Sequence, residues 1–258
     1  MHAHSTQKVR HVDSGAISTL ITTYVLSLIS LIVFNNSFNV LRIALVLVLM
    51  LVNVLSLTRV HLRLISRPRA IDYVLLIINV LPYSYLLYVG YGLIWTIPSL
   101  ILLLIFIIEA VRGRGRGTVA NVAGTVLMAS VYLPWYIMMG GLIHPTIIYI
   151  NAVWLTYHAF SSTYVEGKLP FRPIRPQASS IIWIASLILL TYLVGYFKLS
   201  IYYVIPLIEP TIRAIHAFWE SKLTPNEVRL RIRRIGWGSL IESLILLTLL
   251  LLVTILVK

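Results

Sequence analysis

Long apolar stretches separated by short polar segments dominate the hydrophobic pattern of this chain. A helix needs about 20 mostly apolar residues to cross the hydrocarbon core of a bilayer. Nine stretches reach or approach that length: 15–34, 38–58, 71–89, 92–111, 118–139, 142–163, 179–197, 199–218 and 236–257. The pattern predicts an all-α polytopic membrane bundle of about nine transmembrane helices, in a single integral membrane domain over residues 1–258.

If the nine predicted helices cross the membrane in turn, the basic residues are distributed unequally between its two sides. Eighteen of the 21 lysines and arginines then lie on the side of the N-terminus, and only Arg42, Lys198 and Lys258 lie on the other. Cytoplasmic loops carry such an excess because basic groups are hard to translocate. The distribution therefore predicts that the N-terminus is inside and the C-terminus outside, in a multi-pass protein of the cell membrane.

Composition narrows the class of protein further. The chain is 59% hydrophobic and 11% charged, whereas soluble domains carry about 25% charged residues. Its net charge of +13 is spread over the inner loops, so the expected partners are anionic lipid headgroups and not nucleic acid. The chain has no cysteine, which excludes disulfides and thiol catalysis.

Polar groups within the predicted helices gather towards the inner side. All eight acidic residues fall in that half, and ionisable groups within spans usually face a bundle interior or a wet cavity. We therefore expect any cavity to open to the cytoplasm. The candidate ligand-binding residues are Asn53, Arg59, His61, Arg67, Glu109, His158, Glu209, Arg213, His216 and Glu242.

Three of these candidates share one face of the eighth predicted helix. Glu209, Arg213 and His216 are spaced i, i+4 and i+7, so Glu209 and Arg213 are expected to form an ion pair. Such a pair either locks helix packing or belongs to a substrate or proton site. His158 and His216 come from different helices at similar depth, as a bis-histidine haem requires. Both lie near the interface, however, and no cofactor or metal site is predicted.

Two short phrases at inner helix ends resemble motifs of the UbiA-type intramembrane prenyltransferases. The first runs from Asn53 to His61 and is followed by Arg67-Pro68; the second runs from His158 to Leu169-Pro170. Together with phrases around 11–16 and 236–242, they make the chain similar to the YwiC-like membrane proteins, which are distant relatives of that fold. The resemblance implies nine helices and a lipid or isoprenoid ligand.

The aspartates of the prenyltransferase motifs are missing from this chain. Val54, Leu57 and His61 stand where the first motif has aspartates that hold magnesium. Arginines can bind phosphate without a metal, but they neutralise a leaving diphosphate less well. We therefore expect binding of an anionic or isoprenoid lipid without magnesium-dependent prenyl transfer. A small-solute transporter that uses Glu209, Arg213 and Glu242, and a non-catalytic subunit of a membrane complex, remain alternatives.

Overall fold

The computed structural model describes residues 14–35, 38–64, 69–88, 90 and 93–257 of the chain. Within these residues every regular element is a helix. The elements are α1 (Ser14–Phe34), α2 (Val40–Leu64), α3 (Ala70–Val80), η1 (Leu81–Ser84), α4 (Tyr85–Tyr88), η2 (Ile94–Thr96), α5 (Ile97–Val111), α6 (Thr118–Ser130), α7 (Tyr132–Met138), α8 (Pro145–Lys168), α9 (Pro176–Tyr196), η3 (Ile201–Leu207), α10 (Ile208–Trp219) and α11 (Pro225–Val257). The predicted all-α class is confirmed.

Among the described residues, six helical segments are long and apolar enough to cross a membrane. They are Gly15–Phe34, Ala70–Tyr88, Ile94–Val111, Thr118–Met138, Pro176–Tyr196 and Leu230–Val257. The described helices overlap all nine predicted stretches. The number of nine crossings and the orientation of the chain stay predictions.

Proline divides several of the predicted stretches into shorter helices. Pro82 lies in the 3-10 turn η1 between α3 and α4, and Pro206 lies in η3 before α10. The break between α6 and α7 falls at Val131, close to Pro134. Proline removes a backbone donor and clashes with the preceding turn, so an α-helix is interrupted there.

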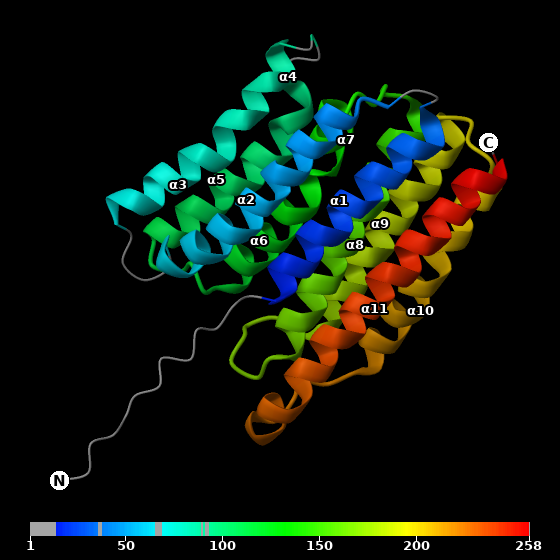
Figure 1. The fold of residues 1–258 in the computed structure, drawn as a ribbon. Coiled ribbons are helices and arrows are strands. Elements are labelled where there is room, and N and C mark those ends of the chain that lie inside the picture. The colour runs from blue at the N-terminus through cyan, green and yellow to red at the C-terminus, as the bar shows by residue number, and fades with distance from the viewer. Residues whose placement is uncertain (1–13, 36–37, 65–68, 89, 91–92, 258) are drawn as a thin grey trace.

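The helices pack in two groups around a buried centre (Figure 1). α8 contacts α6, α9 and α11, while α1 contacts α2, α6, α7 and α11. Buried tryptophan and tyrosine side chains link these helices by hydrogen bonds: Trp154 Nε1 donates to Thr23 Oγ1 at 2.9 Å, and the Tyr132 hydroxyl donates to Ser30 Oγ at 3.0 Å. Each aromatic side chain buries a large apolar surface and gives its polar atom a partner.

Turns that the sequence assigns to the same side lie together at one end of the bundle. Asn35 Nδ2 donates to the Gly140 carbonyl at 2.9 Å, and the Phe34 and His144 rings lie 4.2 Å apart. At the opposite end of α8, the Lys168 carbonyl accepts from the Leu223 amide at 2.9 Å. His144 and Lys168 lie at opposite ends of α8, so these two sets of contacts mark opposite ends of the bundle.

Candidate functional site

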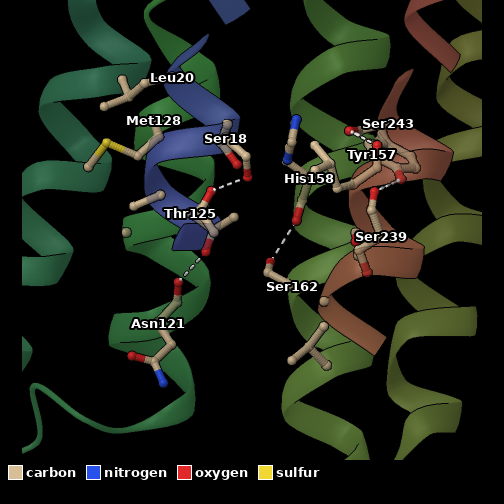
Figure 2. A pocket seen from close by; sticks show the side chains of 18 of the residues that line it. Ser18, Leu20, Asn121, Thr125, Met128, Tyr157, His158, Ser162, Ser239 and Ser243 are labelled. Carbon is tan, nitrogen blue, oxygen red and sulfur yellow. Dashed lines mark hydrogen bonds between the residues drawn. The ribbon is translucent and has the colours of Figure 1, made fainter. Parts of the chain in front are cut away.

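A polar pocket of about 350 Å³ lies between α1, α6, α8 and α11. Each helix contributes small or polar residues at helical spacing, so that one face of each turns towards the pocket. Figure 2 shows these side chains facing one another across the space. The lining consists of Gly15, Ala16, Ser18, Thr19, Leu20, Asn121, Gly124, Thr125, Met128, Tyr157, His158, Ser161, Ser162, Val165, Glu166, Gly236, Ser239, Leu240 and Ser243.

His158 is the predicted candidate that lines this pocket. Its side chain is 5% exposed, and its Nε2 atom has no hydrogen-bond partner in the described part of the protein. The ring packs edge-on against Trp154, with the centroids 4.5 Å apart, which holds it in place. A buried polar atom without a partner is destabilising by about 1–3 kcal/mol. The imidazole therefore has an unused hydrogen-bonding atom beside the pocket.

Several hydroxyl groups in the lining donate to the backbone of their own helices. Thr125 donates to the Asn121 carbonyl at 3.0 Å, Ser162 to His158 at 2.6 Å, and Ser243 to Leu240 at 2.7 Å (Figure 2). A hydroxyl has one proton but two acceptor lone pairs. Because the proton is already used in the helix, the oxygen can act only as an acceptor towards the pocket.

Glu166 stands at one end of the pocket, and its charge is neutralised. Its Oε2 forms an ion pair with Arg172 Nε at 2.7 Å, and its Oε1 accepts from Asn121 Nδ2 at 2.8 Å. The lining itself includes no lysine or arginine. The pocket therefore presents mainly acceptors and carries no excess positive charge, an arrangement suited to an uncharged group that donates hydrogen bonds.

A second group of candidates lines a groove of about 460 Å³ on α10 and α11. Glu209, Arg213, His216 and Glu242 all belong to it, so the predicted shared face of the eighth helix is confirmed. The predicted ion pair is wrong: Arg213 NH1 pairs with Glu242 Oε2 of α11. Glu209 lies in the first turn of α10, and its Oε2 has no hydrogen-bond partner among the described residues.

The partners of Arg213 explain why its direct ion pair is with Glu242 and not with Glu209. Its NH2 donates to Ser239 Oγ at 3.1 Å, and its Cζ lies 4.5 Å from the centroid of the Tyr164 ring. Glu209 on the same helix offers the Arg213 guanidinium one carboxylate. The neighbouring helices α8 and α11 together offer it a carboxylate, a hydroxyl and an aromatic face. Ser239 also lines the polar pocket, and its carbonyl accepts from the Tyr157 hydroxyl at 3.2 Å. The groove and the pocket therefore adjoin at α11.

Of the remaining candidates, Glu109 and Asn53 are described, and neither lines the polar pocket or the groove. Glu109 lies at the end of α5 and pairs with Arg112 at 3.7 Å and Arg114 at 3.8 Å. Asn53 is buried in a third space between α2, α3 and α5. Arg67 lies outside the described residues, as do the side chains of Arg59 and His61. His158 and His216 line different cavities.

The hydroxyl residues of α1 and α11 are functional candidates that sequence reasoning missed. Ser18, Thr19, Ser239 and Ser243 are small polar residues, which are frequent at helix interfaces in membranes without any ligand. The sequence signal that could have identified them is their spacing of three to four residues from one another and from Gly15 and Gly236. The phrases 11–16, 158–170 and 236–242 each contribute lining residues, so the pocket brings all three together.

Comparisons of the chain with protein-family models, with curated proteins and with solved structures find no match. The similarity to YwiC-like and UbiA-type proteins therefore stays a proposal. In the described part of the chain, moreover, no group of three histidine, aspartate or glutamate side chains is placed to hold a metal ion.

Proposed function

We propose that this integral membrane protein binds a membrane lipid and holds the uncharged, hydroxyl-bearing polar part of that lipid in the pocket between α1, α6, α8 and α11. The observation that carries the proposal is the unpartnered Nε2 of His158, buried beside a pocket in which the Thr125 and Ser162 hydroxyls donate within their own helices. In this environment a ligand hydroxyl would complete the hydrogen bonds that the bundle leaves unmade.

The charge of the pocket lining bears on whether the bound lipid is anionic or uncharged. An anionic headgroup needs arginine or lysine contacts or helix N-termini. The Arg172 side chain near the pocket is already paired with Glu166. The described lining therefore supports an uncharged polar group better than an anionic one. An isoprenoid chain remains the proposal that the sequence resemblance supports, and we propose that the pocket opens towards the cytoplasm because polar residues gather at inner helix ends.

Native mass spectrometry of the protein and of two histidine variants tests the proposal. We expect the wild type to retain an uncharged lipid after mild detergent extraction. His158→Phe keeps the aromatic contact with Trp154 but removes the hydrogen bond, so the retained lipid should fall about tenfold, corresponding to about 1.4 kcal/mol. The apolar ring should not lower the melting temperature, because it removes an unpartnered buried atom.

His144→Phe is the matched control. His144 precedes the other end of α8 and is absent from the pocket lining. This variant should retain lipid like the wild type. Failure of the wild type to retain any lipid, or equal retention by His158→Phe, would contradict the proposal. Retention of a purely anionic lipid would contradict the assignment of an uncharged polar group.

A further inference from the structure

The third space, which contains Asn53, is a cavity of about 280 Å³ between α1, α2, α3, η1, η2, α5 and α6. Its lining is mainly leucine and valine, in contrast to the hydroxyl-rich pocket beside α8. The helices α3 and α5 that enclose it carry many apolar side chains on their outer faces, among them Ile77, Ile101 and Leu104. The cavity thus lies behind a surface suited to lipid.

Most polar groups in this cavity already have partners. Asn79 is hydrogen bonded with Ser56 at 2.6–2.9 Å, Ser99 with Ser130 at 2.7 Å, and the Tyr83 hydroxyl accepts from Trp135 Nε1 at 3.1 Å. Asn53 of the described lining is 2% exposed, and its side chain lies beside the Tyr83 hydroxyl. The space is therefore apolar, and its polar side chains lie against one another.

The apolar cavity and the polar pocket meet at two side chains. Leu20 of α1 and Met128 of α6 line both spaces. Figure 2 shows them on the α1–α6 side of the polar pocket, opposite His158. Methionine is unbranched and adapts its shape to its surroundings. The two spaces are therefore neighbours, and an adaptable side chain lies on the wall that they share.

We infer that the apolar cavity holds the hydrocarbon chain of the same lipid whose polar part lies beside His158. This inference rests on the proposed function and deepens it. The ligand is then an amphiphile with one hydrocarbon chain that lies between α3 and α5. Apolar cavities of this size bind hydrocarbon in place of water.

Two neighbouring leucines of α5 provide a matched test. Leu103 lines the cavity, whereas Leu104 is 58% exposed on the outer face and does not. Leu103→Trp should fill part of the cavity and remove contacts with about two methylene groups, which corresponds to roughly a tenfold loss of long-chain monoacylglycerol binding. Short-chain monoacylglycerol should bind Leu103→Trp as it binds the wild type. Leu104→Trp should bind both lipids normally.

Each outcome separates this inference from the proposed function. Equal binding of long-chain lipid by Leu103→Trp and the wild type overturns the chain assignment but leaves the polar site standing. Absence of binding by the wild type overturns both. If Leu103→Trp does not fold, the wild type is cross-linked to a monoacylglycerol with a diazirine at the chain end. Cross-links to residues that line the apolar cavity support the inference, and cross-links confined to residues outside that lining overturn it.

Discussion

At the scale of single residues, Arg213 is the residue that joins three helices. It pairs with Glu242, donates to Ser239 and lies against the rings of Tyr164 and Phe160. Its side chain is 12% exposed and that of Glu242 is 24% exposed. A charge held so deeply needs its partner, because removing one member leaves the other uncompensated. We interpret this pair as a packing interaction between α10 and α11.

A double-mutant cycle measures that interaction. Arg213→Met and Glu242→Gln should each lower the free energy of unfolding, and the double variant should lose less than their sum, with a coupling of about 1–3 kcal/mol. The same cycle with Arg213→Met and Glu209→Gln should give a coupling below about 0.5 kcal/mol, because Glu209 makes no ion pair with Arg213. Stronger coupling to Glu209 would contradict the observed pairing. Reversible unfolding in detergent provides the measurement.

Sequence spacing predicted which charged residues share a face but not which of them pair. The i, i+4, i+7 positions placed Glu209, Arg213 and His216 correctly in one groove. Spacing within one helix contains no information on what a neighbouring helix presents, and Glu242 and Ser239 come from α11. Similarly, the candidate His158 could be found from its type, whereas the hydroxyls opposite it depend on how α1 and α11 pack.

At the scale of elements, the end of α8 is tied to the segment between α10 and α11. Lys168 Nζ pairs with Glu220 Oε2 at 3.0 Å and donates to the Ser221 carbonyl at 3.0 Å. The Tyr164 hydroxyl donates to Glu220 Oε2 at 2.7 Å. The Lys222 ammonium donates to the Arg172 carbonyl. These contacts hold two loops together beside the Glu166 end of the polar pocket.

The Glu220 contacts predict a pH dependence of stability. Partial burial opposes ionisation of Glu220, but the hydrogen bonds from Tyr164 and Lys168 and the charge of Lys168 outweigh it and lower its pKa below 4.5. A carboxylate whose pKa is lower in the folded state stabilises the protein at pH values above its unfolded-state pKa. That stabilisation is lost as the pH falls through the folded-state pKa. Glu220→Gln should therefore lower the melting temperature at pH 7.

The difference between Glu220→Gln and the wild type should shrink as the pH falls below 4.5. Because Glu220 is partly exposed, the effect at pH 7 should be about 1 kcal/mol or less. Thermal unfolding in detergent at a series of pH values measures it. A difference that stays constant from pH 7 to strongly acid conditions would contradict the assigned role of the carboxylate.

The sequence predicted the existence of the helices better than their interruptions. The last helix starts earlier than the predicted stretch 236–257: α11 begins at Pro225, and the Thr224 amide donates to Glu227 Oε2 at 2.9 Å. Local capping contacts of this kind mark the start of a helix. The 3-10 turns η1 and η3 depend on how neighbouring helices accommodate Pro82 and Pro206, which the sequence pattern does not contain.

At the scale of the whole molecule, apolar side chains fill the core and also cover much of the outside. Large apolar side chains are exposed on α3, α5 and α9, whereas hydroxyls, the Asn121 amide and an imidazole line the interior pocket. This distribution suits a bundle surrounded by lipid, in which polar groups are placed in the interior. The central claim is that the interior pocket is reached from the cytoplasm and occupied by a lipid.

Modification of a single cysteine at Thr125 tests this claim most directly, because the chain has no cysteine of its own. Thr125 lines the pocket and is close in size to cysteine. Arg116→Cys and Leu142→Cys, at exposed positions, serve as controls for the predicted inner and outer sides. The account predicts that a charged thiol reagent modifies Thr125→Cys only from the cytoplasmic side and that added monoacylglycerol slows the reaction. Modification from outside, or an unchanged rate with saturating lipid, would contradict it.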